Sequence, residues 1–311
     1  MRIAILGRTK MLYDTALKLE AYGHKIVVIG TCKEAPEYNV TTEDFRMLSE
    51  RLNSDFFVSN TLNSKEIIEI LQSANIDIGV SVNWLTVVGK EAIESCGQGI
   101  LNAHCGDLPR YRGNACANWA LINGEEKVGL SIHFMEPNEL DSGDIVIKSF
   151  MEIYEETIIG EIYNWLDMQV PDMFLEAVNG LEAGSIIPVQ QDKDPQKSLR
   201  CYPRKPNDSR INWNNNAVII DRIIRASSEP FAGAYTFLKG QKIIVWRSKV
   251  GKLPCPSCFI PGQILWQNLE TGEIAVGSGG NSVLIIIRAQ VEGEMEKDPC
   301  EIVHSLRSRF E

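Results

Sequence analysis

The chain has 311 residues, of which 44% are hydrophobic and 23% charged, an ordinary composition for a soluble globular protein long enough for two domains. Its formal net charge is -10, so the surface as a whole repels a phosphate backbone, and we expect no nucleic acid partner, although a local basic patch would evade this whole-chain argument. No apolar run approaches the roughly 20 residues of a membrane span, and the N-terminus enters a strand rather than a signal peptide, so we expect a cytoplasmic protein without a membrane partner.

Short apolar runs alternate with amphipathic segments through the first 190 residues. We predict strands at residues 2–6, 25–30, 55–58, 76–82, 99–102, 128–135, 144–150 and 186–189. We predict helices after the turn Gly7–Lys10 to about Tyr22, from Thr41 onwards, and over 64–73, 88–96, 114–122 and 157–180. Strands and helices that alternate through short turns predict an α/β fold, with a doubly wound, Rossmann-like parallel sheet in the N-terminal part.

Polar residues follow three of the predicted strands, at Gly7–Lys10, Asn83–Leu85 and Asn102–His104. In open α/β sheets, ligands bind beyond the carboxyl ends of the strands, so these segments are candidates for a shared site. The first combines a glycine, two cations and a helix start, which favours an anion, although a plain turn remains an alternative. It is neither a Walker loop nor Gly-x-Gly-x-x-Gly, so neither ATP nor NAD is indicated.

Asn102 and His104 stand two residues apart, so in an extended segment their side chains project from the same face. An acidic turn, Asp141-Ser-Gly-Asp144, follows about forty residues later. An amide, an imidazole and a carboxylate brought together by a fold make an acid–base site. On spacing alone, a structural histidine and an ordinary turn remain open.

The pattern changes near residue 190, where a polar stretch rich in helix breakers begins. We predict a domain over 1–189, a linker over 190–209 and a second domain over 210–311. The second domain begins with a helix over 217–226. We predict its strands at residues 234–238, 242–248, 262–266, 273–277 and 282–289. Short strands at this spacing predict a small open β-barrel of the OB type.

Eight cysteines are scattered through the chain, most of them in apolar runs, and we interpret these as reduced core residues. Cys255 and Cys258 form a single CxxC without two further ligands at suitable spacing, so a loop with incidental thiols is favoured over zinc. We therefore predict no metal site. Cys105 lies beside His104, which makes a nucleophilic thiol an alternative to acid–base chemistry.

An ordered set of motifs carries a resemblance to a known family. The motifs are Asn102-x-His104, Leu108-Pro-x-Tyr-Arg-Gly113, Trp119-Ala-Leu-Ile-Asn-Gly124, Gly129-x-Ser-Ile-His-x-Met135 and Leu140-Asp-Ser-Gly-Asp-Ile145. The chain resembles the formyltransferases that depend on N10-formyltetrahydrofolate. It departs from them after His104, where relatives commonly carry Ser-Leu-Leu-Pro and this chain has Cys-Gly-Asp-Leu-Pro.

The resemblance implies that Asn102, His104 and Asp141 are catalytic and that the formyl group passes directly from N10-formyltetrahydrofolate, without a covalent intermediate on Cys105. It also implies a folate site and an acceptor site. The folate site is expected at Trp84, Leu85, Asp141 and Asp144. The acceptor site is expected at Arg8, Thr9, Lys10, Arg112, Arg204 and Asp208. The last two resemble a motif of the members that act on sugar nucleotides.

Three branches of the family compete. The tRNA branch usually carries a basic insertion near the N-terminus, whereas residues 31–44 here are acidic; the purine branch is a single domain of about two-thirds this length. The nucleotide-sugar branch, which includes the formyltransferase domain of the bacterial aminoarabinose lipid A modification enzyme, fits best. We therefore expect an N-formyltransferase acting on a UDP- or dTDP-linked 4-amino-4-deoxy sugar, for a bacterial surface glycan. Small-molecule partners and a possible homodimer follow from the resemblance.

Three alternatives are kept. A methionyl-tRNA formyltransferase has the same catalytic residues and overall length. A non-catalytic module that binds folates or nucleotide sugars has the same fold, because fold does not fix activity. Hydrolysis of the formylated folate differs only in the use of water as the acceptor.

Overall fold

The computed structural model describes residues 1–34 and 39–311. The four remaining residues fall in the acidic stretch 31–44 and lie outside the described residues. The chain divides into two compact units. The first comprises residues 1–116, 128–151 and 163–202, and the second comprises 117–127, 152–162 and 203–311. Residues 190–202 of the predicted linker thus belong to the first unit.

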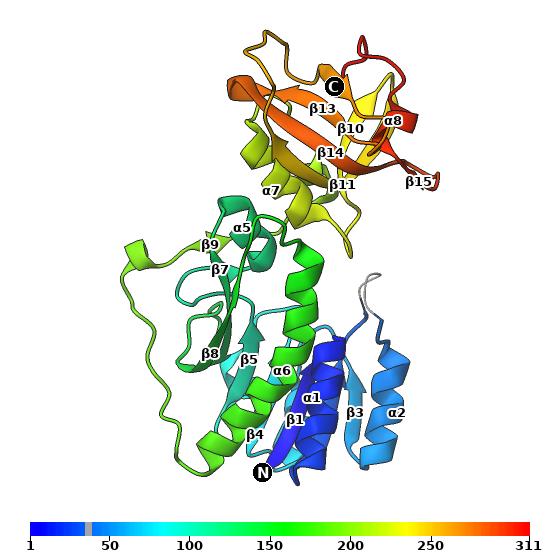
Figure 1. Cartoon of the computed structure of the whole chain (residues 1–311). Helices are drawn as coiled ribbons and strands as arrows, with labels where there is room; N and C mark the ends of the chain where they lie inside the picture. Colours follow the sequence, from blue (N-terminus) through cyan, green and yellow to red (C-terminus); the bar gives the residue numbers. More distant parts are fainter. Residues whose placement is uncertain (35–38) are drawn as a thin grey trace. The chain divides into compact units, whose positions relative to one another are not determined.

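A seven-stranded sheet forms the centre of the first unit, in the order β3-β2-β1-β4-β5-β7-β8 (Figure 1). The first five of these are parallel, and β7 runs antiparallel to β5. The bounds are β1 Arg2–Gly7, β2 Lys25–Thr31, β3 Asp55–Val58, β4 Ile78–Val82, β5 Ile100–His104, β7 Lys127–Phe134 and β8 Ile145–Glu152. The predicted Rossmann-like fold is confirmed. The predicted strand at 186–189 is reduced to one bridge between Ile145 and Val189, because only one residue pair meets the edge of the sheet.

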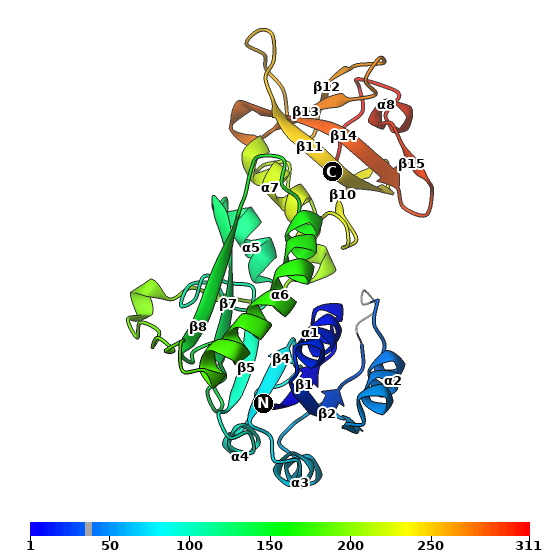
Figure 2. The same ribbon diagram turned by 60° about the horizontal axis from the view of Figure 1, so that its bottom comes forward.

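Helices cover both faces of this sheet. Alternate residues of β1 face opposite sides, and Ala4 and Leu6 pack with α3 and α4, which lie side by side (Figure 2). An ion pair between Lys18 and Asp172 joins α1 to α6 on the other face. The bounds of these helices are α1 Lys10–Ala21, α2 Thr42–Leu52, α3 Lys65–Ser73, α4 Lys90–Glu94 and α6 Ile159–Glu182, whereas α5 Cys116–Asn123 falls in the second unit apart from its first residue.

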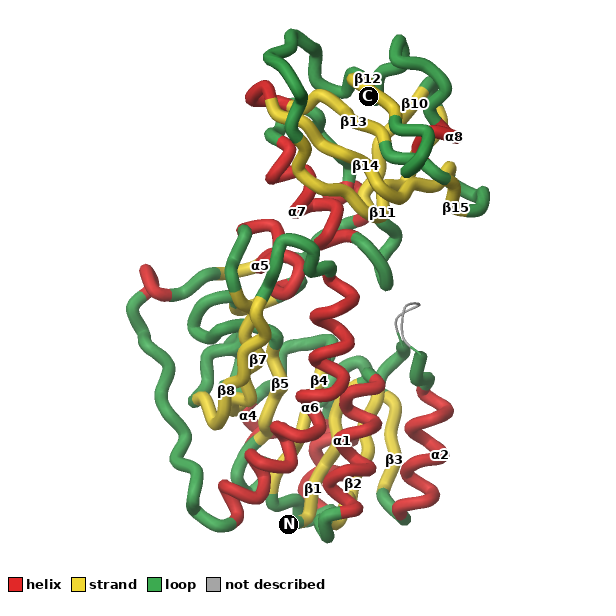
Figure 3. The backbone as a smooth tube through the Cα atoms, viewed as in Figure 1, coloured by secondary structure: helices red, strands yellow, loops and turns green. Residues whose placement is uncertain are grey.

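The second unit is built on an antiparallel sheet in the order β10-β11-β14-β13-β12, with β15 paired to β14 (Figure 3). One face packs on α7 (Ala217–Ser227) around a core that includes Trp213, Ile220 and Ile224. The bounds are β10 Ala234–Leu238, β11 Gln241–Gly251, β12 Ile264–Gln267, β13 Ile274–Ser278, β14 Ser282–Val291, β15 Glu296–Lys297 and α8 Pro299–Ile302. The predicted fold class, with a small β domain in the C-terminal part, is confirmed.

Three two-residue strands were not predicted from the sequence: β15, given above, and two strands of the first unit. Residues Arg112–Gly113 form β6, and Arg200–Cys201 form β9; they pair in parallel. Each has only two residues, so neither carries a periodic signal. In the described part of the chain, no helix is both long enough and apolar enough to cross a membrane.

Candidate active site

The pairing of β5 with β7 places four polar side chains opposite one another inside an apolar sheet. Asn102 stands opposite His133, and His104 stands opposite Ser131. His133 and Ser131 are buried, as is His104. Buried polar groups in a strand need partners, so these residues must bond among themselves or to nearby loops.

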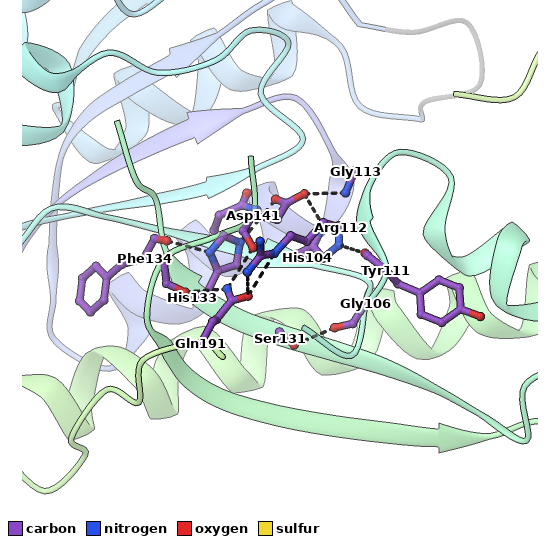
Figure 4. Close-up of polar contacts among 12 residues, drawn as sticks. His104, Gly106, Tyr111, Arg112, Gly113, Ser131, His133, Phe134, Asp141 and Gln191 are labelled. Carbon is purple, nitrogen blue, oxygen red and sulfur yellow. Dashed lines mark hydrogen bonds and ion pairs between the residues drawn. The ribbon is translucent and has the colours of Figure 1, made fainter. Parts of the chain in front are cut away.

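His133 fixes the orientation of the Asn102 carboxamide. Its Nδ1 lies 2.7 Å from the carbonyl oxygen of Phe134, so Nδ1 carries the proton and Nε2 of the neutral ring is an acceptor (Figure 4). Nε2 lies 3.1 Å from Nδ2 of Asn102 and therefore accepts one of its protons. The second N–H of Asn102 remains for another acceptor.

His104 is held in one tautomer by the main chain. Its Nε2 donates to the carbonyl oxygen of Tyr111 at 2.5 Å, which leaves the lone pair of the neutral ring on Nδ1. Gly106 lies against this edge of the ring, where a Cβ would stand 2.7 Å from Nε2 and 2.4 Å from the oxygen of Tyr111. Burial lowers the pKa of His104 and outweighs the carboxylate of Asp141, which raises it, so the resting imidazole is neutral.

Asp141 faces both histidines. Its Oδ2 is 3.5 Å from Nδ1 of His104 and accepts a hydrogen bond from the N–H of Gly113 at 2.8 Å, and its Oδ1 is 3.6 Å from Nε2 of His133 (Figure 4). Burial raises the pKa of Asp141, but the two histidines and the Gly113 N–H together outweigh it and bring the pKa to about 2. The carboxylate is therefore ionised at neutral pH. The structure thus brings the predicted Asn102, His104 and Asp141 together.

The predicted folate residues lie on two adjoining loops. The N–H of Asn138, on the loop that leads to Asp141, donates to the carbonyl of Val88, on the loop that contains Trp84. Within the described structure, the buried Nε1 of Trp84 and Oγ of Ser142 have no hydrogen-bond partner. Orphaned donors beside these loops fit a site for a ligand that carries many acceptors. Leu85 is exposed, and Asp144 is half-buried.

The predicted acceptor residues of the first loop are engaged locally. Thr9 caps α1 through its hydroxyl, which accepts from Leu12, and Lys10 pairs with Asp14. Arg8 donates to the carbonyl of Lys33 at 3.1 Å. Their role toward an acceptor stays a prediction.

The remaining predicted acceptor residues divide between the two units. Arg112, beside the site, donates from Nε and Nη2 to Oε1 of Gln191. In the second unit, Arg204 donates to the carbonyls of Ala226 and Asp208 and to nearby hydroxyls. Asp208 accepts from the N–H of Lys205 at 2.6 Å and caps a short turn. The structure therefore gives Arg204 and Asp208 partners that hold their own unit together.

Two residues of the site were given no role by the sequence analysis, His133 and Gln191. A signal for His133 was present, because Ser131 and His133 repeat on β7 the polar spacing of Asn102 and His104 on β5. Gln191 carries no such signal. It lies in the stretch predicted to be a linker, yet it is buried.

The thiols take no visible part in the site. Burial raises the pKa of Cys105 to about 12, so it stays protonated and is a poor nucleophile. Cys255 and Cys258 are both exposed. Over residues 1–34 and 39–311, no group of three His, Cys, Asp or Glu side chains is arranged to hold a metal ion.

A carboxamide donor, a neutral imidazole and an ionised carboxylate at one end of a Rossmann-like sheet are the groups that an enzyme transferring an acyl-type group would need. The chain belongs to the formyl transferase family. Residues 1–178 match the formyl transferase model, and residues 204–307 match the model of the formyl transferase C-terminal domain. The co-substrate of this family is N10-formyltetrahydrofolate.

Two relatives and one solved structure show the range of the family. The chain is 27% identical to the methionyl-tRNA formyltransferase of Solibacter usitatus over 94% of this chain and 92% of that one. It is 33% identical to that of Clostridium botulinum over 73% and 70%. The structure of an N-formyltransferase from Helicobacter canadensis, in complex with folinic acid and dTDP-3-aminofucose, superposes with a TM-score of 0.63 at 14% identity, over 92% of this chain and 98% of that one.

These comparisons correct the expected acceptor. The prediction of a nucleotide-linked amino sugar is wrong, because the curated relatives that match along most of the chain are methionyl-tRNA formyltransferases. The sugar enzyme shares only the fold at 14% identity. The prediction rested on whole-chain acidity and on the Arg204 motif, and the partners of Arg204 explain that motif without a sugar. The relatives also oppose the expectation that no nucleic acid is bound.

Proposed function

We propose that the protein transfers the formyl group of N10-formyltetrahydrofolate to the α-amine of methionyl-tRNA. The arrangement of Asn102, His104 and Asp141 supports the transfer chemistry. The match to curated methionyl-tRNA formyltransferases along almost the whole of both chains supports the acceptor. This match is the observation that carries the proposal.

The distribution of charge removes the objection to a polyanionic acceptor. Residues 203–311 contain 14 lysines and arginines against 11 aspartates and glutamates, a net charge of +3. Residues 1–202 contain 17 against 30, a net charge of -13. The acidity is therefore concentrated in residues 1–202, and residues 203–311 carry a small positive net charge, which does not repel a phosphate backbone.

Asn102 is placed to stabilise the oxyanion. Attack by an amine on the formyl carbon produces a tetrahedral centre with a negative oxygen, and a donor aimed at that oxygen lowers the barrier. Since His133 accepts one N–H of Asn102, the carboxamide is fixed before the reaction and need not reorganise. Its free N–H is the donor.

His104 is placed to carry the proton that the amine loses. The ring is neutral, and Nδ1 holds the lone pair because Nε2–H is donated to Tyr111. A proton taken up at Nδ1 lies beside Oδ2 of Asp141, whose negative charge stabilises the imidazolium. His104 then returns the proton to the leaving nitrogen of the folate.

The loops of Trp84 and Asp141 would hold the folate. The orphaned Nε1 of Trp84 and Oγ of Ser142 provide donors there, and Leu85 provides apolar surface. All eight cysteines are free thiols, which is typical of a reducing compartment, so we place the reaction in the cytoplasm.

The test is a purified-enzyme assay with N10-formyltetrahydrofolate and methionyl-tRNA, in which formylmethionine and released folate are measured together. Equal amounts of the two products are expected. The His104→Ala variant serves as the control for contaminating enzymes. Folate release that is unchanged when methionyl-tRNA is omitted would show hydrolysis instead and would overturn the proposal.

A further inference from the structure

Gln191 is buried in a stretch of chain that is otherwise exposed. Only 5% of its surface is accessible, whereas Gln190 and Asp192 on either side are exposed. Two residues earlier, Val189 exchanges two hydrogen bonds of 2.8 Å with Ile145 at the start of β8. The chain is thus attached to the sheet immediately before Gln191.

The carboxamide of Gln191 uses its full bonding capacity. Its Oε1 accepts from Nε and Nη2 of Arg112 at 3.2 and 2.6 Å, and its Nε2 donates to the carbonyls of Asp141 and Gly143 at 2.9 and 2.7 Å (Figure 4). If the amide were flipped, its NH₂ group would face the donors of Arg112 and its oxygen would face the two carbonyl oxygens. One orientation therefore satisfies all four contacts.

These four hydrogen bonds together help to fix the position of Asp141. Asp141 has a left-handed backbone with φ of 51°, a conformation that a non-glycine residue keeps only when its surroundings hold it. Gly113, which follows Arg112, holds the carboxylate through its N–H. Gln191 binds both the backbone of Asp141 and the side chain of Arg112, so it fixes the spacing between the two segments that place the carboxylate.

We propose that Gln191 is a positioning residue for formyl transfer, which holds the Asp141 carboxylate opposite His104 by tying the 141–143 turn to Arg112. The inference rests on the proposed function, since it assigns Gln191 to that reaction. A neutral amide suits this task because it donates to two carbonyls and leaves the charge of Arg112 uncancelled. A glutamate could accept from Arg112, but its second carboxylate oxygen would face the two carbonyl oxygens and could not donate a hydrogen bond to them.

The test compares three variants of the full chain. Gln191→Leu removes all four bonds at similar volume, and Gln191→Glu keeps only those to Arg112. Gln190→Leu makes the same change one residue away, at an exposed position. We expect kcat to fall about 10- to 100-fold in both Gln191 variants, with the KM for N10-formyltetrahydrofolate nearly unchanged, because a small displacement of a catalytic group costs rate rather than binding.

A second readout needs no turnover. The carboxylate of Asp141 raises the pKa of His104, against burial, His133 and Arg112, which lower it. When Asp141 is released, the pKa of His104 should fall further, and NMR titration of the imidazole would show this in both Gln191 variants but not in Gln190→Leu. A His104 titration identical to that of the wild type, in Gln191→Leu or in Gln191→Glu if the first fails to fold, would overturn the proposal. Absence of formyl transfer by the wild type, with the titration shifted as expected, would refute the proposed function and leave the positioning role standing.

Discussion

Asp141 in the first unit and Asp221 in the second are both buried acids with hydrogen-bonded partners, and the comparison separates a reactive site from a structural one. Asp221 accepts from Nε of Arg225 at 2.8 Å, one turn along α7, and from Oγ of Ser248 at 2.7 Å. Arg225 also donates to the carbonyl of Thr157 at 2.9 Å. Every partner of Asp221 is thus a permanent donor at hydrogen-bonding distance.

Asp141 instead faces two imidazoles at 3.5 and 3.6 Å, well beyond the 2.7 and 2.8 Å contacts of Asp221. An imidazole can gain or lose a proton near neutral pH, whereas a guanidinium cannot. The carboxylate therefore faces a side chain that is positively charged only during the part of the reaction cycle in which the imidazole is protonated. Burial alone does not distinguish a catalytic carboxylate from a structural one. The distinguishing feature of Asp141 is that its neighbouring side chains can gain and lose a proton.

The largest expected effect is on the rate. His104→Ala removes the only group beside Asp141 that we assign to proton transfer, so kcat should fall roughly 10²- to 10⁴-fold. The free energy of unfolding should change far less than the rate, and urea denaturation checks this. A kcat within tenfold of the wild type would place the proton transfer elsewhere.

The corresponding change in the other unit should act on stability. Asp221→Ala leaves the buried Arg225 without its carboxylate, which costs about 3–5 kcal/mol of unfolding free energy. The value of kcat per folded molecule should stay within twofold. As a control, Glu292→Ala breaks the exposed pair with Lys242 and should cost at most about 1 kcal/mol. A loss of kcat in folded Asp221→Ala would erase the distinction between the two acids.

His133 tests whether the orientation of Asn102 matters. His133→Phe keeps a ring of similar size but removes the acceptor for the Asn102 amide, so kcat should fall about tenfold. The matched control is His24→Phe, which breaks a similar contact, 2.9 Å from Nε2 to Oδ1 of Asn179, at another place in the same unit. Equal rates for the two variants would contradict the role of His133.

The smallest effect is the position of the acidic limb of the pH–rate profile. His104 accepts a proton only when neutral, and burial lowers its pKa below the ordinary value of 6.5. Accordingly, the acidic limb that His104 contributes to kcat should have its midpoint below 6.5, apart from any limb set by the acceptor amine, whose ordinary pKa is about 8. Asp141→Asn should move this limb to still lower pH, because Asp141 raises the pKa of His104. An imidazole midpoint above 6.5, read directly by NMR titration of His104, would contradict a buried neutral imidazole.

Local sequence patterns were sufficient for most of the fold. The strands β3 and β10 have the predicted bounds, because turn residues flank each of them. The grouping of Asn102 and His104 followed from strand periodicity, and Asp141 entered through the family motif. The functions of His133 and Gln191 depend on contacts 31 and 50 residues distant along the chain, which local patterns do not encode.

The acceptor was mispredicted because the net charge of the whole chain was used in place of the distribution of charges along it. The net charge of -10 is the sum of -13 over residues 1–202 and +3 over residues 203–311, and only the separate values bear on nucleic acid. The Arg204 motif was equally ambiguous. The sequence does not distinguish an arginine that bonds to carbonyls and hydroxyls within its own unit from one that binds a substrate.

Gly106 closes one edge of the His104 imidazole with main-chain atoms. The Nε2 edge of the ring is thus occupied by the protein itself, and Nδ1, beside Asp141, is the ring nitrogen left for exchange with a bound molecule. A side chain at position 106 would place its Cβ 2.4 Å from the Tyr111 oxygen and 2.7 Å from Nε2 of His104, so we expect a substitution there to lower the activity of the enzyme along with the binding of any inhibitor of this site.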